Sequence, residues 1–125
     1  MTTYLTRAEV EAIHADQIAR YGGSLGVRDR GKLEAAVARP KTGYYADLIA
    51  EAAALWESLS QNHPFIDGNK RTALGSAYTF LAVNGLRMTA TADELWSFLA
   101  HHYERGTFRF DVLDAWLRAN TRKVG

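Results

Sequence analysis

The segment that most constrains the fold is residues 47–62, because its apolar stripe is too wide for a helix that lies on a surface. The stripe has a helical period and consists of Leu48, Ile49, Ala52, Ala53, Leu55, Trp56 and Leu59. A stripe of this width is typical of a helix that is buried on more than one side. Pro64 ends the helix near Asn62, since the residue before a proline disfavours the helical region. We therefore expect the remaining elements to pack around one central helix.

The same period, with start and stop signals, predicts about five further helices. We expect them from Thr6 to Gly22, from Asp29 to the residue before Pro40, from Asn69 to Asn84, from Thr91 towards Gly106, and around 112–117. Thr6 and Thr91 each begin a capping box that ends in a glutamate three residues later. The prediction is an all-α, compact bundle of about six helices in a single domain, residues 1–125. At most a minor pair of short strands is expected, between Leu5 and residues 86–90.

The composition excludes several classes of function. The 15 basic and 14 acidic residues leave a formal charge of +1, so no overall field is expected that would attract nucleic acid. The short basic stretch at residues 118–123 is expected to be a solvated tail. Cysteine is absent, which excludes disulfides, thiolate metal sites and cysteine nucleophiles. No apolar stretch is long enough to span a bilayer. We therefore expect a cytoplasmic protein with no direct nucleic-acid partner and no membrane partner.

Residues 63–71, His-Pro-Phe-Ile-Asp-Gly-Asn-Lys-Arg, carry the strongest chemical signal. They form a short loop that leads into a helix N-terminus, where unpaired N–H groups and the positive end of the helix dipole favour an anion. Gly68 permits close backbone approach, and Lys70 and Arg71 add two positive charges. Two cations oppose the dipole at this end, so their placement is unfavourable unless an anion lies between them. The pattern predicts a phosphate site.

Three side chains of this loop have distinct expected roles. Asp67 is an oxygen ligand of the kind that Mg²⁺ takes together with phosphates. His63 can accept a proton near neutral pH. Phe65 is expected to point into the core and to fix the loop. Each residue alone is common in a structural role, since lone histidines often only hydrogen-bond and Asp-Gly-Asn is an ordinary turn. Their joint spacing predicts a reaction on a nucleotide phosphate.

The loop resembles the motif of the Fic family, H-x-F-x-[D/E]-G-N-G-R-x-x-R. It is closer to the variant H-x-F-x-D-[A/G]-N-K-R, which is typical of the Doc (death-on-curing) branch of the Fic/Doc superfamily. The similarity extends to Arg20–Gly23, Val27–Asp29 and Leu33–Pro40, and to the short, helical chain. The resemblance therefore covers most of the sequence and implies the Fic/Doc helical fold.

The resemblance implies a role for each residue of the loop. His63 is the expected general base, which activates a hydroxyl of a target protein. Asp67 is expected to hold Mg²⁺ on the phosphates of ATP, and Phe65 is the expected core anchor. The part that binds the nucleotide phosphates is expected to consist of Gly68, Asn69, Lys70 and Arg71.

Two departures from the common Fic motif bear on the reaction. Lys70 replaces its second glycine, and Leu74 replaces its second arginine, so one phosphate clamp is missing. Both fit the Doc branch, in which the nucleotide is reversed and the γ-phosphate is transferred. The resemblance thus implies a toxin that acts as a protein kinase on a serine or threonine hydroxyl of a translation factor, with elongation factor Tu as the expected target. A Fic-type protein adenylyltransferase and a non-catalytic phosphate-binding module are the alternatives.

The resemblance also implies protein partners. Many Fic enzymes carry an inhibitory motif, [S/T]-x-x-x-E-[G/N], but no glutamate of this chain precedes glycine or asparagine. A toxin of this kind is expected to be restrained by a cognate antitoxin whose C-terminal segment binds in trans. The first helix and residues 44–56 are expected to border its groove. Tyr44 and Tyr45 stand where Fic proteins carry a target-docking loop, and docking a substrate and covering the core are equally supported for them.

Overall fold

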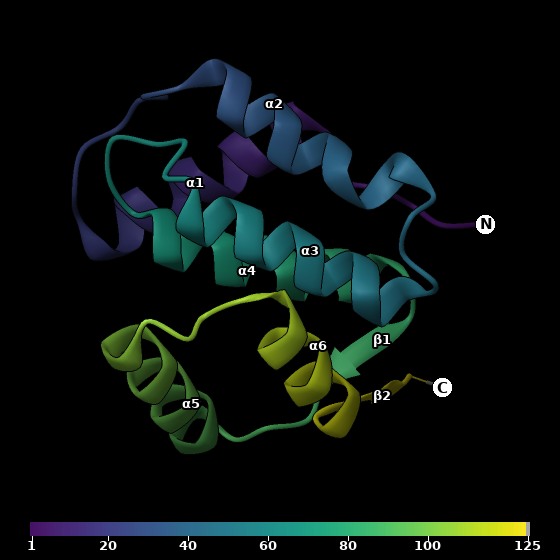
Figure 1. Ribbon diagram of the computed structural model, residues 1–125. Coiled ribbons are helices and arrows are strands. Elements are labelled where there is room, and N and C mark those ends of the chain that lie inside the picture. Colours follow the sequence, from purple (N-terminus) through teal and green to yellow (C-terminus); the bar gives the residue numbers. More distant parts are fainter. Residues whose placement is uncertain (125) are drawn as a thin grey trace.

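The computed structural model describes residues 1–124, which are predominantly helical (Figure 1). Within that range the α-helices are α1 (Arg7–Tyr21), α2 (Arg30–Ala38), α3 (Leu48–Gln61), α4 (Asn69–Val83), α5 (Ala92–Arg105) and α6 (Phe110–Ala119). The other elements are a 3-10 turn, η1 (Arg39–Thr42), and two short strands, β1 (Leu86–Met88) and β2 (Thr121–Lys123). None of the described helices has both the length and the apolar character that crossing a bilayer requires. The all-α prediction is confirmed, and every expected helix is present.

α3 is the central helix that its apolar stripe predicted. Its side chains are buried almost all round, and Trp56 is fully buried. It packs most extensively against α4 and also contacts α6 and α2, so neighbouring helices cover several of its sides (Figure 1). Residues 62–68 connect α3 directly to α4. The loop that carries the chemical signal therefore joins the two helices with the most extensive mutual packing.

The helices differ in how the free N–H groups of their first turns are satisfied. Four of them, α1, α2, α3 and α5, are capped by the side-chain oxygens of Thr6, Asp29, Asp47 and Thr91, respectively. Both predicted capping boxes, in α1 and α5, are present. In α6, the N–H of Phe110 donates to the Glu57 carboxylate at 2.6 Å. The N-cap residue of α4 is Gly68, which has no side chain to act as a cap. Among the described α-helices, α4 alone thus has a first turn without a side-chain acceptor.

The strand prediction holds only in part. Residues 86–88 do form a strand, but their antiparallel partner is β2. Leu5, the predicted partner, is buried in the core instead. The prediction of a solvated tail at residues 118–123 is wrong, because Arg118 belongs to α6 and pairs with Asp47, and β2 follows. A three-residue strand depends on which main-chain edge lies beside it, and local sequence does not reveal that edge.

Candidate active site

The loop between α3 and α4 is braced by the segment that follows α1. Val27 and Phe65 form an antiparallel bridge. The Pro64 carbonyl accepts hydrogen bonds from the N–H groups of Arg28 and Asp29, at 2.8 and 3.0 Å. These main-chain bonds join segments that are far apart in the sequence. The loop is therefore held in one conformation by the protein itself.

The inner side of the loop is fixed by Phe65, the predicted core anchor, which is only 1% exposed. The ring of His14, from α1, stacks on it with the ring centroids 3.9 Å apart and the planes nearly parallel. His14 Nε2 also lies 2.8 Å from the Asp67 carbonyl oxygen. Because a carbonyl oxygen only accepts, this ring nitrogen must carry a proton. One buried histidine thus contacts both the anchor and the acidic residue of the loop.

His14 is a site residue that the sequence analysis missed. It is 3% exposed and shares the buried face of α1 with Val10 and Ile18. Val10, His14 and Ile18 are four residues apart, so the histidine interrupts an otherwise apolar stripe. A polar side chain at such a position needs a hydrogen-bond partner inside the protein. That requirement was the signal that could have revealed it.

The side chain of Asn69 also holds the loop. Its Oδ1 accepts from the N–H of Phe65 at 2.9 Å, and its Nδ2 donates to the carbonyl oxygen of the same residue at 3.0 Å. Both polar atoms of the amide are therefore engaged. Of the predicted phosphate-binding set, Asn69 contributes its main-chain N–H to the start of α4, whereas its side chain fixes the loop.

His63 lies at the outer end of the loop, where its exposed side chain lines a groove. Its φ of 49° is in the left-handed region, which non-glycine residues rarely adopt. Arg28 Nε donates to its carbonyl oxygen at 3.0 Å and helps to hold this conformation. The prediction that Pro64 forces this residue out of the helix is confirmed. Backbone strain at an exposed titratable residue is typical of functional sites.

Asp67 has an exposed carboxylate that is held by main-chain groups. Its Oδ1 accepts from the N–H of Gly68 at 2.8 Å, and its Oδ2 accepts from the N–H of Ser24 at 3.2 Å. A Cβ on Gly23 would lie 2.6 Å from Oδ2, so the backbone approaches the carboxylate more closely than a side chain would permit. Each oxygen keeps a lone pair for a cation. Within residues 1–124, no group of three or more histidine, aspartate or glutamate side chains is placed to hold a metal ion.

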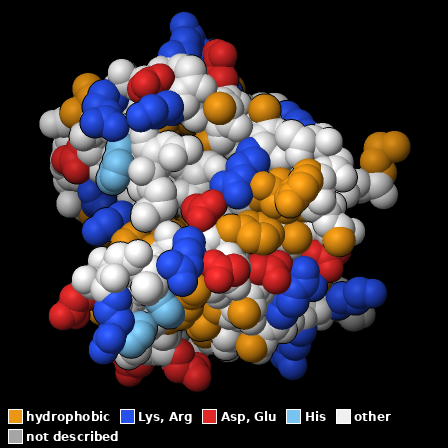
Figure 2. All heavy atoms as spheres, viewed as in Figure 1, with side chains coloured by type: hydrophobic (Ala, Val, Ile, Leu, Met, Phe, Trp, Pro, Cys, Tyr) orange, Lys and Arg blue, Asp and Glu red, His pale blue; other side chains and the backbone are white. Residues whose placement is uncertain are grey.

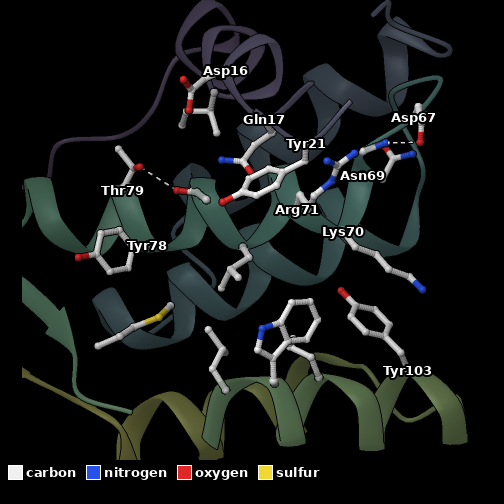
Figure 3. A pocket seen from close by; sticks show the side chains of 18 of the residues that line it. Asp16, Gln17, Tyr21, Asp67, Asn69, Lys70, Arg71, Tyr78, Thr79 and Tyr103 are labelled. Atoms are coloured by element: carbon white, nitrogen blue, oxygen red, sulfur yellow. Dashed lines mark hydrogen bonds between the residues drawn. The ribbon is translucent and has the colours of Figure 1, made fainter. Parts of the chain in front are cut away.

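The two cations in the first turn of α4 lie against different aromatic rings (Figure 3). Lys70 Nζ is 4.3 Å from the centroid of the Tyr103 ring. The Arg71 guanidinium lies 5.5 Å from the Tyr21 ring centroid and donates to the Gly22 carbonyl at 3.1 Å. From the helix dipole alone, these two charges are unfavourable without an anion between them. The aromatic faces offset part of that cost, because they attract cations. The N–H groups of the same turn still have no side-chain acceptor.

A groove of about 1440 Å³ extends from the loop along α4, with α1 on one side and α5 on the other (Figure 3). One end is lined by the predicted polar set, namely His63, Asp67, Gly68, Asn69, Lys70 and Arg71. The remainder is largely apolar and includes Ile13, Leu74, Tyr78, Leu95, Trp96 and Leu99. Trp96 is 70% exposed. An apolar wall open to solvent is typical of a surface that another protein covers.

The groove has only one of the two borders that the sequence analysis named. The first helix lines it through Ala12, Ile13, Asp16, Gln17 and Tyr21. Residues 44–56 do not line it. Residues 50–56 of that segment, which lie within α3, cannot border a groove, because Trp56 and the alanines there are buried. The opposite border is α5, which was predicted only as a helix from Thr91 towards Gly106.

Tyr44 and Tyr45 are not brought to the site. They precede α3, whereas His63 follows it, and a helix of 14 residues is about 21 Å long. Tyr45 contacts Phe110, and its hydroxyl accepts from Arg39 Nε at 2.6 Å. Tyr44 is 83% exposed. Figure 2 shows hydrophobic side chains gathered among charged ones over this part of the surface, where η1, α3 and α6 meet. The two tyrosines thus lie at the far end of the central helix from the loop.

Taken together, an exposed histidine, a carboxylate and an uncapped helix N-terminus lie at the same end of one groove, on a braced loop between two helices. The chain belongs to the Fic/DOC family, whose model matches residues 4–81, more than half of the sequence. This range contains α1 to α3, the entire loop, and all of α4 except its last two residues. The family resemblance of the sequence motif is thereby confirmed.

Two relatives narrow the assignment to the Doc branch. The chain is 49% identical over 98 residues to a protein named Toxin Doc from Mycolicibacterium smegmatis (strain ATCC 700084 / mc(2)155), covering 74% of this chain and 73% of that protein. It is 37% identical over 89 residues to a protein named Protein kinase doc from Escherichia phage P1, covering 68% of this chain and 71% of that protein.

Proposed function

We propose that this chain is a Doc-type toxin that acts as a protein kinase. It would transfer the γ-phosphate of ATP to a serine or threonine hydroxyl of a translation factor, with elongation factor Tu as the expected target, and so inhibit translation. The observation that carries the proposal is that His63, Asp67 and the uncapped N-terminus of α4 line the same end of one groove. The names of the two relatives, one a toxin and one a protein kinase, support it.

The donors at this end of the groove suit a magnesium-bound nucleotide. Asp67 would hold Mg²⁺, with phosphate oxygens and water as the other ligands. The free N–H groups of the first turn of α4, together with Lys70 and Arg71, would hold the phosphates. MgATP bound there supplies the phosphoryl group that is transferred. The residues of the chain bind it, orient it and remove a proton from the acceptor.

The proton acceptor would be the imidazole of His63. No side-chain hydrogen bond engages this ring within residues 1–124, so it is available to an incoming hydroxyl. Its backbone is held by the braced loop, which limits where the ring can lie. Phosphoryl transfer depends chiefly on positioning, because the attacking oxygen must approach in line with the phosphorus atom. The long cation Lys70, at a position where Fic enzymes have glycine, supports a reversed nucleotide whose γ-phosphate is attacked.

The apolar part of the groove would receive the C-terminal segment of the cognate antitoxin. Its wall continues from the polar end along α4 and α5, and Trp96 lies exposed in it. An amphipathic segment could cover this wall with its apolar side and reach the phosphate site with its end. The chain itself has no inhibitory Glu-Gly or Glu-Asn sequence. The lack of this inhibitory sequence is consistent with inhibition by a second protein.

The first test is a label-position assay. The antitoxin-free protein is incubated with bacterial lysate, or with purified elongation factor Tu, in the presence of Mg²⁺ and ATP labelled at either the α- or the γ-phosphate. We expect label on a protein only from the γ position. His63→Ala should abolish it, since removal of a general base typically lowers the rate by about 10²- to 10⁴-fold. His101→Ala is the matched control, because His101 is an exposed histidine of α5 outside the groove lining.

The other outcomes separate the alternatives. Label from the α position would identify an adenylyltransferase and contradict the interpretation of Lys70. No label from either position, with His63→Ala indistinguishable from wild type, would leave a phosphate-binding module. Label on a protein other than elongation factor Tu would keep the kinase and replace its target.

A further inference from the structure

Tyr103, in the last turn of α5, contacts the phosphate site although no step of the proposed reaction uses it. Its ring faces the side chain of Lys70 across the groove (Figure 3). The distance from Lys70 Nζ to the ring centroid, 4.3 Å, is well within the range at which a ring attracts a cation. Tyr103 lies outside the residues that the family model matches, 4–81.

Other contacts hold the ring in place. One face stacks on Phe108, with the centroids 4.3 Å apart and the planes 13° from parallel. Lys70 Nζ lies over the same ring, 4.3 Å from its centroid. Phe108 is itself fully packed in the core. The face offered to the lysine is therefore anchored to the interior of the protein.

The phenol oxygen is anchored as well. It lies 2.7 Å from Oγ of Ser60, a buried residue at the end of α3. The two hydroxyls are within hydrogen-bond distance, and the Ser60 hydroxyl also lies 3.0 Å from Gln61 Oε1. Burial raises the pKa of the Tyr103 phenol to about 12, which keeps it protonated near neutral pH. The ring thus meets Lys70 as a neutral aromatic face and not as an anion.

We propose that Tyr103 is a positioning residue for Lys70: its ring holds the ammonium group beside the uncapped N-terminus of α4, so that the lysine meets the nucleotide phosphates already ordered. The inference rests on the proposed function, in which Lys70 binds those phosphates. A free lysine side chain loses rotamer entropy on binding a phosphate, and an ordered one loses less. An ammonium that has one side on a ring still directs N–H groups away from it, and these remain available to phosphate oxygens.

The test compares Tyr103→Leu with Tyr103→Phe, each alone and in combination with Lys70→Met. Tyr103→Leu removes the aromatic face, and we expect it to raise the KM for MgATP about three- to tenfold while kcat changes less than about twofold. Tyr103→Phe keeps the face and loses only the hydrogen bond to Ser60, so its KM should stay within about twofold of wild type. In the Lys70→Met background, Tyr103→Leu should produce no further change, because a residue that acts through the lysine has nothing left to position.

A measurement that does not depend on activity accompanies the kinetics. The lysines are reductively methylated with ¹³C-formaldehyde, and the Lys70 resonance is assigned by its absence in Lys70→Met. Over a ring face, its methyl signals should be shifted upfield in wild type and in Tyr103→Phe, and should return to the ordinary lysine position in Tyr103→Leu. Circular dichroism melts of each variant check that the fold is retained.

Each result has a definite meaning. No upfield shift in wild type, an unchanged KM in Tyr103→Leu, or an equal effect of Tyr103→Leu with and without Lys70 would each overturn the positioning role. The last of these would mean that Tyr103 only supports the fold. A wild-type protein that transfers no phosphate to any protein would overturn the proposed function together with this inference. An active wild type with an unaffected Tyr103→Leu variant would overturn the inference alone.

Discussion

Two histidines contact the same loop and have opposite environments. His63 is exposed and lines the groove, whereas His14 is buried against Phe65 and donates to the Asp67 carbonyl. His63 was predicted, because it belongs to the sequence motif of the loop. The second comes from a helix that ends more than 40 residues before the loop, so only the fold brings it there. Residues adjacent to a motif can be recognised from sequence, and residues that support it from another helix are much harder to recognise.

The hydrogen bond of His14 can be tested separately from its packing. His14→Phe keeps an aromatic ring against Phe65 but removes the donor to the Asp67 carbonyl. We expect a loss of about 1–2 kcal/mol in the free energy of unfolding, because a hydrogen bond is lost and its acceptor is left partly buried. Phosphate transfer should fall as well, since the loop that carries His63 and Asp67 loses one of its supports. Urea unfolding and the γ-label assay measure the two effects, and a variant equal to wild type in both would show that the stack alone holds the loop.

At the scale of elements, the helices were predictable because their signals are local. Capping boxes, apolar periods and the two prolines act within a few residues of each helix end. The strand pair was not predictable in the same way, because β1 and β2 are separated by α5 and α6. The uncapped start of α4 was predictable only in part. Its glycine and its two cations are visible in the sequence, but the aromatic partners of those cations belong to α1 and α5.

Asp47, the N-cap of α3, forms an ion pair with Arg118 of α6, and this pair makes the free energy of unfolding depend on pH. The Arg118 guanidinium, which donates to both oxygens of Asp47 at 2.9 and 3.0 Å, holds the pKa of that carboxyl below its ordinary value, and the capping bond from Ala50 adds to the effect. A lowered pKa in the folded state stabilises the fold at pH values above the ordinary pKa, and this contribution is lost as the pH falls through the lowered value. Acid should therefore weaken the link between the two helices.

Asp47→Asn tests this link, because asparagine is an equally good N-cap but carries no charge. We expect the variant to be less stable than wild type at neutral pH by less than about 1 kcal/mol, since both partners are nearly half exposed. The difference should shrink as the pH is lowered below 3.8, the ordinary pKa of the group. Urea unfolding of both proteins between pH 7 and pH 3 gives the comparison. A difference that stays constant over this range would rule out the charge as its source.

At the scale of the whole molecule, the groove is a product of three helices and a loop that meet only in the folded chain. Its polar end was predicted residue by residue, because all six predicted side chains or main-chain groups belong to one short stretch. Its apolar wall was assigned in part to residues 44–56, which do not line it, and residues 50–56 are buried instead. Apolar residues of a core and of an exposed wall have the same sequence pattern. Only packing distinguishes them, and for Trp96 it leaves 70% of the residue exposed.

Trp96 therefore provides a test of the partner surface. If the antitoxin segment covers the apolar wall, Trp96→Ser should weaken its binding about tenfold or more, as is common for an aromatic residue at the centre of an interface. The free energy of unfolding should change by less than about 0.5 kcal/mol, because the residue is mostly exposed. Tyr44→Ser is the matched control, an exposed aromatic residue at the other end of α3. Calorimetric titration with the cognate antitoxin should separate the two variants, and equal affinities would place the antitoxin elsewhere.

The two ends of the described chain are tied to the same turn after α4. Thr3 exchanges two hydrogen bonds with the side chain of Asn84, and the N–H of Val124 donates to the carbonyl of Gly85. Both ends of the described chain are thus held by hydrogen bonds at the end of α4 that lies opposite the phosphate site. Since α4 has 15 residues, about 22 Å of helix separates the two. A force that pulls residues 3 and 124 apart would therefore break these hydrogen bonds first. The loop with His63 would come under tension only afterwards.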